Sequence, residues 1–236
     1  MLSQILARRP ARLRDDVVRM ISDIDRTLPD TDGLKWFNRL YLEVTLAVNQ
    51  AVAGGAFRDP GFIVSLDVVF ANLYFDAAAA GDAAPSEAPP AWRPLFHARQ
   101  QPNIARIQFA LAGMNAHINR DLPDGIVKSF LAVGGSPTKT DARHDDFERV
   151  NGILETVEAQ VKSTFSVGVI GDIDKIAGRL DDILAMWSVR SARDAAWTHA
   201  EVLWTLGPAP LLRSGFFSNL DHFTGFAGRG LLVPVI

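Results

Sequence analysis

One segment of the chain, from Phe62 to Asp76, restricts the possible folds more than any other. Its apolar residues fall on every side of a helix, so a helix here would have neighbours all around it. The segment also contains Asp67, Asn72 and Asp76, and the last two share one face because they are four residues apart. Buried polar groups need hydrogen-bond partners. The segment therefore predicts a central helix whose polar residues either cross-link neighbouring helices or line a polar pocket.

Helical spacing of apolar residues returns along most of the chain, and alternating strand patterns are essentially absent. The stretch 81–90, rich in Gly, Ala and Pro, predicts an exposed connection, but the flanking helices are too apolar to be separate units. We therefore predict an all-α fold, a single domain over residues 1–236 with about eight helices around a central buried helix. The expected helices cover 13–28, 34–53, 60–80, 103–120, a short stretch after Pro123, a stretch starting at Asp145 or Asp146, 173–206 and 211–226.

Charge and cysteine content exclude several classes of function. A net charge of -3 leaves no basic excess to neutralise a phosphate backbone, so no nucleic-acid partner is expected. The chain has no cysteine, which removes disulfides, thiolate zinc sites and cysteine nucleophiles. The N-terminus lacks the apolar stretch of a signal peptide, and no apolar run approaches the ~20 residues of a membrane span. We expect a cytoplasmic protein without a membrane partner.

A histidine and an aspartate lie one turn apart in the helix expected before Pro123. At this spacing His117 and Asp121 can hydrogen-bond, which would orient the imidazole and raise its basicity. Gly113 precedes His117 on the same face and predicts open space beside the ring. With Asp76 from another helix, these residues would line one cavity as a catalytic set. His117 would transfer the proton, Asp121 would orient the imidazole ring of His117, and Asp76 would be a second acid or base. The alternative is a helix-end ion pair without a catalytic role.

Further polar and aromatic residues extend this candidate site. The helix Leu184 to Leu206 places three tryptophans and several charges on one stripe, which should face a cleft, a partner chain or a covering segment. The alternative is that the tryptophans belong to the core and the charges lie at its margin. The expected substrate-binding residues are Asn38, Asn72, Asn115, Asn151, Trp187, Arg190 and Asp194.

Motifs for common cofactors are missing from the sequence. It has no phosphate-binding glycine loop, dinucleotide fingerprint, Gly-x-Ser-x-Gly nucleophile turn or His-Glu-x-x-His zinc motif. Histidine is scarce, so we expect no cofactor and no tightly held transition metal. A divalent metal bound by Asp76, His117 and Asp121 stays open as the alternative.

Several segments together resemble a known protein family. They are residues 36–42, 66–76, 91–96, 113–123, 147–151, 179–204 and 228–234. In these segments the chain is similar to a bacterial family named domain of unknown function 5995, and the likeness covers nearly the whole chain. The family has no established activity. The resemblance therefore implies that the polar residues above belong to shared motifs and assigns no catalytic role.

Two functions fit this sequence. The first is an enzyme that performs general acid–base chemistry, such as cyclisation, dehydration, isomerisation or hydrolysis, on a small, largely apolar molecule in a pocket of the bundle core. The second is a non-catalytic protein, either a small-molecule binder or an oligomeric scaffold such as a homodimer. The number of polar residues inside strongly apolar helices favours the enzyme.

Overall fold

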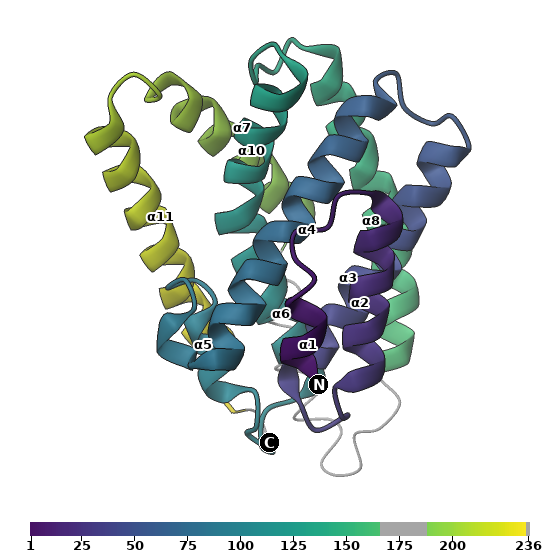
Figure 1. Cartoon of the computed structure of the whole chain (residues 1–236), viewed down its shortest axis with the longest axis vertical. Helices are drawn as coiled ribbons and strands as arrows, with labels where there is room; N and C mark the ends of the chain where they lie inside the picture. The colour runs from purple at the N-terminus through teal and green to yellow at the C-terminus, as the bar shows by residue number, and fades with distance from the viewer. Residues whose placement is uncertain (166–187, 235–236) are drawn as a thin grey trace.

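The computed structural model describes residues 1–165 and 188–234, and within these ranges it contains helices and no strand (Figure 1). The predicted all-α bundle is confirmed. Its elements are α1 (Leu2–Leu6), α2 (Arg14–Thr27), α3 (Gly33–Ala53), α4 (Pro60–Ala83), η1 (Pro85–Glu87), α5 (Arg93–Ala98), α6 (Arg106–Ala116), η2 (His117–Asp121), α7 (Leu122–Val133), α8 (Ala142–Phe165), α10 (Val189–Thr205) and α11 (Pro210–Leu231).

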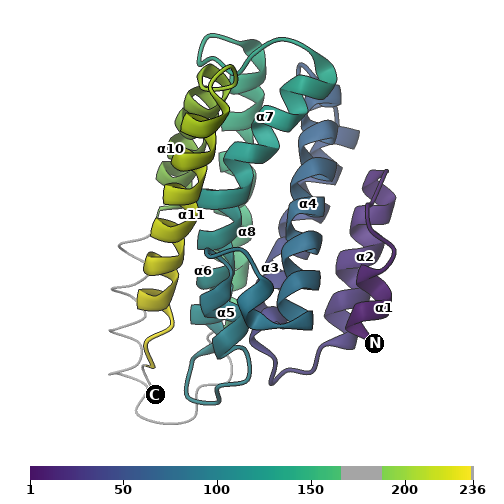
Figure 2. The same ribbon diagram turned by 60° about the vertical axis from the view of Figure 1, so that its left-hand side comes forward.

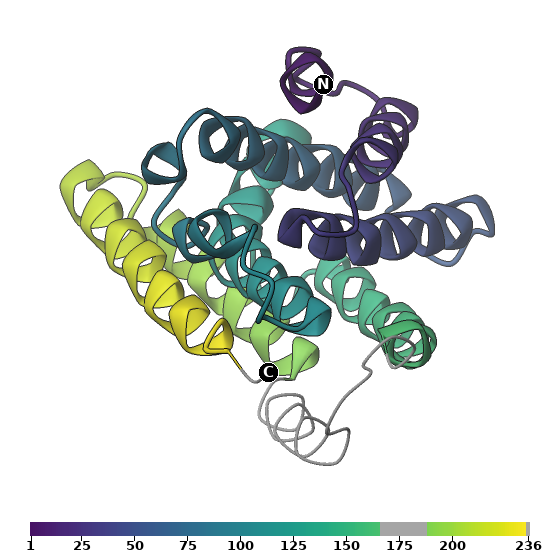
Figure 3. The same ribbon diagram turned by 90° about the horizontal axis from the view of Figure 1, so that it is seen from below.

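Helices α6 and α7, joined by η2, form one continuous helical rod through the bundle (Figure 2). Helix α6 packs against α3 and α11, while α7 packs against α4 and α10. Every residue from Gln108 to Gly113 is buried, because α6 has neighbours on all sides. Viewed from below, α1 and α2 lie on one side of the molecule and α11 on another (Figure 3). The rod therefore holds the central position.

Helix α4 contains the apolar segment 62–76. It packs along α7 and α1 and buries Phe62, Tyr74 and Phe75. Other apolar residues, such as Leu73, are only half-buried, so α6 is enclosed more completely than α4. The expectation that no apolar stretch approaches the length of a membrane span is wrong for α4, whose length and hydropathy would permit one. This is weak evidence for a span, because the core helix of a soluble protein passes the same test.

Several element boundaries differ from the predicted ones. Helix α4 continues to Ala83, into the stretch predicted as an exposed connection. Gly81 is buried there, and a Cβ at this position would overlap the ring of Phe96, so glycine permits the close approach of α5. The predicted helix 173–206 is described only in part, since residues 166–187 lie outside the described ranges. Helix α1 went unpredicted because five residues are too few to show a periodic pattern.

Buried apolar residues form two clusters within the bundle. One cluster surrounds Phe37 and Trp92. The other surrounds Phe130 and Trp197. Three half-buried residues pack against both clusters and so mark their junction: Val44, Phe70 and Met114.

Candidate functional site

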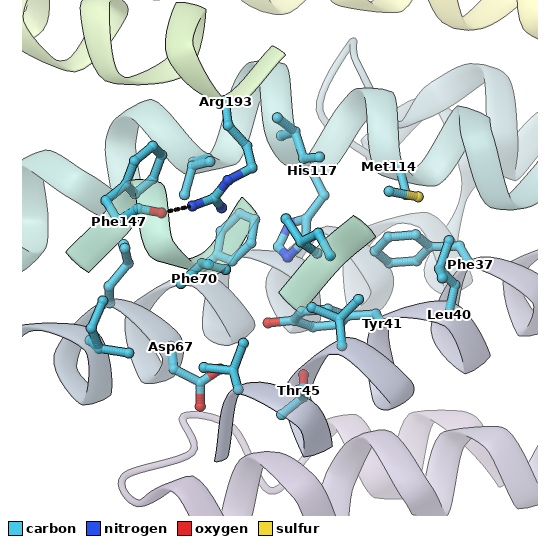
Figure 4. A pocket seen from close by; sticks show the side chains of 18 residues that line it. Phe37, Leu40, Tyr41, Thr45, Asp67, Phe70, Met114, His117, Phe147 and Arg193 are labelled. Atoms are coloured by element: carbon cyan, nitrogen blue, oxygen red, sulfur yellow. Dashed lines mark hydrogen bonds between the residues drawn. The ribbon is translucent and has the colours of Figure 1, made fainter. Parts of the chain in front are cut away.

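A cavity of about 100 Å³ lies where the two apolar clusters meet. Its walls come from α3, α4, α8, α10 and the rod formed by α6, η2 and α7 (Figure 4). Most of the lining side chains are apolar, including the three junction residues. The polar or charged residues in the wall are Tyr41, Thr45, Asp67, His117 and Arg193.

A π-helical turn places the histidine in the cavity wall. Residues 117–121 form this turn, and the N–H of Leu122 donates to the carbonyl of His117. Such turns are rare and occur often at functional sites. Pro123 follows directly, and its lack of an N–H favours a departure from regular helical bonding at this point.

His117 and Asp121 form the predicted hydrogen bond, with Nδ1 of the ring 2.9 Å from Oδ2 of the carboxylate. Asp121 is completely buried and also accepts from Trp92 Nε1 at 3.0 Å and from Arg120 at 2.6 Å. Burial alone would raise the pKa of Asp121, but the His117 hydrogen bond and the Arg120 charge hold it below its ordinary value. An ionised carboxylate accepts from all three groups. Nδ1 of His117 therefore carries the proton.

The other ring nitrogen of His117 is free to act as a base. Nε2 is buried and has no hydrogen-bond partner among the described residues. The ring stacks on Phe70 with centroids 3.5 Å apart and packs edge-on against Tyr41. Burial lowers the pKa of His117, although Asp121 opposes this effect. The ring is thus a neutral imidazole at pH 7 with its lone pair unused.

We expect His117 to remain neutral, as the Nδ1–H tautomer, at pH values where an ordinary histidine with a pKa near 6.5 is half protonated. Because folding lowers this pKa, the contribution of His117 to stability is present above about pH 6.5 and is lost as the pH falls. Long-range ¹H–¹⁵N correlation spectra over a pH series report both the tautomer and the titration. The His117→Asn spectrum assigns the resonance. Titration at or above pH 6.5, or an Nε2–H tautomer, would contradict the expectation.

Oδ2 of Asp67 in the cavity wall also lacks a hydrogen-bond partner within the described part of the chain. The hydroxyls of Tyr41 and Thr45 have no partner at full hydrogen-bond distance, but they lie near enough to each other for Thr45 to lower the pKa of Tyr41. Burial raises the pKa of Asp67 to about 7, against the opposing charge of Arg14. Burial also raises the pKa of Tyr41 well above its ordinary value. Tyr41, Asp67 and His117 line the cavity from α3, α4 and η2, and Figure 4 shows Asp67 at one edge with its carboxylate directed away from His117. Around neutral pH, proton donors and a proton acceptor therefore share one cavity.

The predicted cavity shared by Asp76, His117 and Asp121 is wrong for Asp76. The Asp76 side chain is 69% exposed and pairs with Arg9 at 3.0 Å. It lies nine residues after Asp67, which at ~100° per residue puts the two carboxylates on opposite faces of α4. Asp67, not Asp76, is the carboxylate of α4 that lines the cavity. Asp121 is not in the wall itself but holds the His117 ring from behind.

The alternative metal site with Asp76 as a ligand is also contradicted, since Asp76 is remote from His117. Among residues 1–165 and 188–234, no group of three or more His, Asp or Glu side chains could hold a metal ion. The open space predicted at Gly113 is filled as well. A Cβ at this position would overlap the ring of Phe37, so the glycine allows close packing of α6 on α3.

Three of the predicted substrate-binding asparagines instead cross-link the bundle. Asn38 donates to a backbone carbonyl of α2 and accepts from Tyr74. Asn72 bonds both backbone groups of Ala11, and Asn115 donates to a carbonyl of α11. None of the three lines the cavity. These three asparagines therefore connect neighbouring segments of the bundle and do not bind a ligand in the cavity.

Helix α10 presents Arg193 to the cavity in place of the residues predicted from this helix. Arg190 and Asp194 are exposed, and Arg190 pairs with a glutamate of α8 at 2.7 Å. Arg193 is buried, and its Nε donates to Asn151 Oδ1 at 2.6 Å. Asn151 does not line the cavity itself, but its hydrogen bond holds Arg193, which does. Trp187 lies outside the described residues.

Fold and site together define a class of protein: an all-α bundle around a small apolar cavity with a buried histidine–aspartate pair in its wall. Comparison with protein families matches residues 14–234 to a family of unknown function, DUF5995. The chain belongs to this family. No curated protein and no solved structure matches the chain.

Proposed function

We propose that this protein is an enzyme that performs general acid–base chemistry on a small, largely apolar molecule bound in the cavity. One observation carries the proposal. Two polar atoms without partners among the described residues, on Asp67 and His117, lie in the wall of one otherwise apolar cavity together with the neighbouring hydroxyls of Tyr41 and Thr45. Each such buried atom costs about 1–3 kcal/mol. A ligand that hydrogen-bonds to them would remove this cost, and apolar walls with a few convergent polar groups are typical of small-molecule sites.

His117 is the general base in this proposal. Its Nε2 accepts a proton from a C–H or O–H group of the ligand, and Asp121 stabilises the resulting imidazolium through Nδ1. Arg120 and Trp92 keep Asp121 ionised and fixed in place. Asp121 therefore positions the base and does not exchange protons itself.

Asp67 is the general acid, supported by the neutral hydroxyls of Tyr41 and Thr45. With a pKa of about 7, it has a proton to donate near neutral pH. In a dehydration, His117 removes a proton, Asp67 protonates the departing hydroxyl, and water leaves. In an isomerisation, the proton removed at one carbon returns at another. Cyclisation and hydrolysis also use such an acid–base pair, but the separate acid and base favour the first two.

Hydrogen–deuterium exchange tests the base even when the product of the reaction is unknown. We would incubate the protein in D₂O with small aldehydes, ketones and hydroxy acids and follow the loss of their C–H signals by NMR. The wild type is expected to exchange or convert at least one compound. The variant His117→Asn keeps an N–H near the position of Nδ1 for Asp121 but lacks Nε2, so its rate should fall by about 10²–10⁴-fold.

The variant His117→Gln is the matched control for side-chain size, because its amide reaches the position of Nε2. Unlike asparagine, glutamine leaves Asp121 with one hydrogen-bond donor fewer. It should also be inactive, since an amide is not a base. Binding of the same compounds is measured by saturation-transfer NMR. Compounds that bind to the wild type but neither exchange nor react would support the non-catalytic binding protein instead. Equal rates in the wild type and His117→Asn would also reject the proposed base.

A further inference from the structure

Arg193 places a buried positive charge in the cavity wall. The residue is 6% exposed and is the one Lys or Arg among the described residues that line the cavity. Its Nε donates to Asn151 Oδ1 at 2.6 Å, and one terminal nitrogen donates to the carbonyl of Phe147 at 2.7 Å (Figure 4). Both acceptors are neutral. The other N–H groups of the guanidinium have no acceptor in the described part of the chain.

No carboxylate compensates this charge directly. Within residues 1–165 and 188–234, Arg193 has no ion pair, and the face of the Phe147 ring lies 3.9 Å from the guanidinium carbon. Glu148 is held away from Arg193 by Asn151, whose Nδ2 donates to Glu148 while its Oδ1 accepts from Arg193. Glu148 and Asp194 act only at a distance, and burial lowers the pKa of Arg193 to about 10. A buried cation without a partner is strongly unfavourable, so this site lacks an anion.

We propose that the cavity binds a small monocarboxylate, with the carboxylate on Arg193 and the apolar body between α3 and α4. This inference rests on the proposed function and names its substrate class. A planar guanidinium matches a carboxylate well, and a single Arg neutralises one negative charge, whereas a phosphate dianion would need more cations. Asp67 does not oppose an anion when it is protonated. A cavity of ~150 Å³ holds benzene, so about 100 Å³ suits a smaller body such as a short acyl chain.

Two pairs of probes test the charge of the ligand: propionate against propionamide, and butyrate against butyramide. Members of a pair have nearly the same shape and differ in charge. Isothermal calorimetry should show that at least one carboxylate binds to the wild type tenfold or more tightly than its amide. The variant Arg193→Met should lose this preference. The variant Arg149→Met makes the same change at an exposed arginine of α8 and should keep it.

The variant Arg193→Lys keeps the charge without the planar fork, and should bind the carboxylate more weakly than the wild type yet still prefer it to the amide. This variant covers the case in which Arg193→Met does not fold, which circular dichroism would show. Equal affinity for acid and amide in the wild type, or an unchanged preference in Arg193→Met, would overturn the proposal. Binding does not depend on Nε2 of His117. Lost exchange in His117→Asn without a carboxylate preference would therefore retain the proposed function and reject this inference alone.

Discussion

Replacing Asp121 by alanine is expected to lower the free energy of unfolding by about 3–5 kcal/mol. The carboxylate is completely buried and accepts hydrogen bonds from Trp92, His117 and Arg120. Alanine would leave the buried donors of Trp92 and His117 without this acceptor, and the half-buried Arg120 would lose its closest carboxylate and keep a longer contact of 3.5 Å to Asp221. Urea denaturation followed by tryptophan fluorescence measures the loss.

Asp76→Ala is the matched control for this experiment. It removes a carboxylate of the same kind from a surface ion pair, so the loss should stay below about 1 kcal/mol. Asp121→Asn retains the shape and one acceptor oxygen and should fall between the two. A loss below about 1 kcal/mol in Asp121→Ala would show that the hydrogen bonds to Asp121 contribute little to stability. The proposal that Asp121 fixes the orientation of His117 would then be rejected.

Asp67→Asn is expected to make the protein more stable at pH 8 and leave its stability nearly unchanged at pH 4. Folding raises the pKa of Asp67 from 3.8 to about 7, so between these pH values the native state binds a proton that the unfolded state has released. The stability of the wild type therefore falls as the pH rises through this range. A shift of about three pKa units corresponds to roughly 4 kcal/mol, and partial exposure of the residue reduces the expected gain to about 2–4 kcal/mol.

Chemical denaturation of both proteins at pH 4, 6 and 8 measures this difference directly. Other groups titrate over the same range, but they titrate equally in both proteins and cancel in the comparison. Asp76→Asn makes the same change at a surface ion pair on the exposed face of the same helix and is the control. A gain for Asp67→Asn that is equal at all three pH values would mean that folding does not raise the pKa of Asp67, and the protein would lose its proposed acid.

Much of the fold could be predicted because packed helices require apolar residues at a regular spacing in the sequence. The apolar spacing located the helices of the bundle, and the Asp59–Pro60 start of α4 and the glycines after α3 and α7 marked their ends. Helix α1, with five residues, is too short to show this spacing. The predicted centre shifted from α4 to α6 because composition reports how apolar a helix is, while enclosure depends on how many neighbours reach it.

The candidate site was predicted only where its residues are local in sequence. His117 and Asp121 are one turn apart, so helical spacing alone predicted their hydrogen bond. Asp67 and Asp76 are both polar residues in an apolar helix, and spacing offered no reason to prefer the one that faces the cavity. Arg193 shares the buried face of α10 with Val189, Ala196 and Trp197, but the predicted stripe took its charged residues from Arg190 and Asp194, which are exposed. The role of Trp92 depends on a contact 29 residues away along the chain, which no local pattern contains.

The π turn also ties this site to the length of the chain. A π turn is an α-helix with one additional residue, taken up locally as a bulge. Removing one residue from 117–121 would let α6 run into α7 as an ordinary helix, with the outward faces of both helices still in register with their neighbours. The bundle would survive such a deletion, while His117 would no longer be carried by the bulge. The presentation of His117 to the cavity therefore depends on the number of residues between Gly113 and Pro123, and not only on which residues they are.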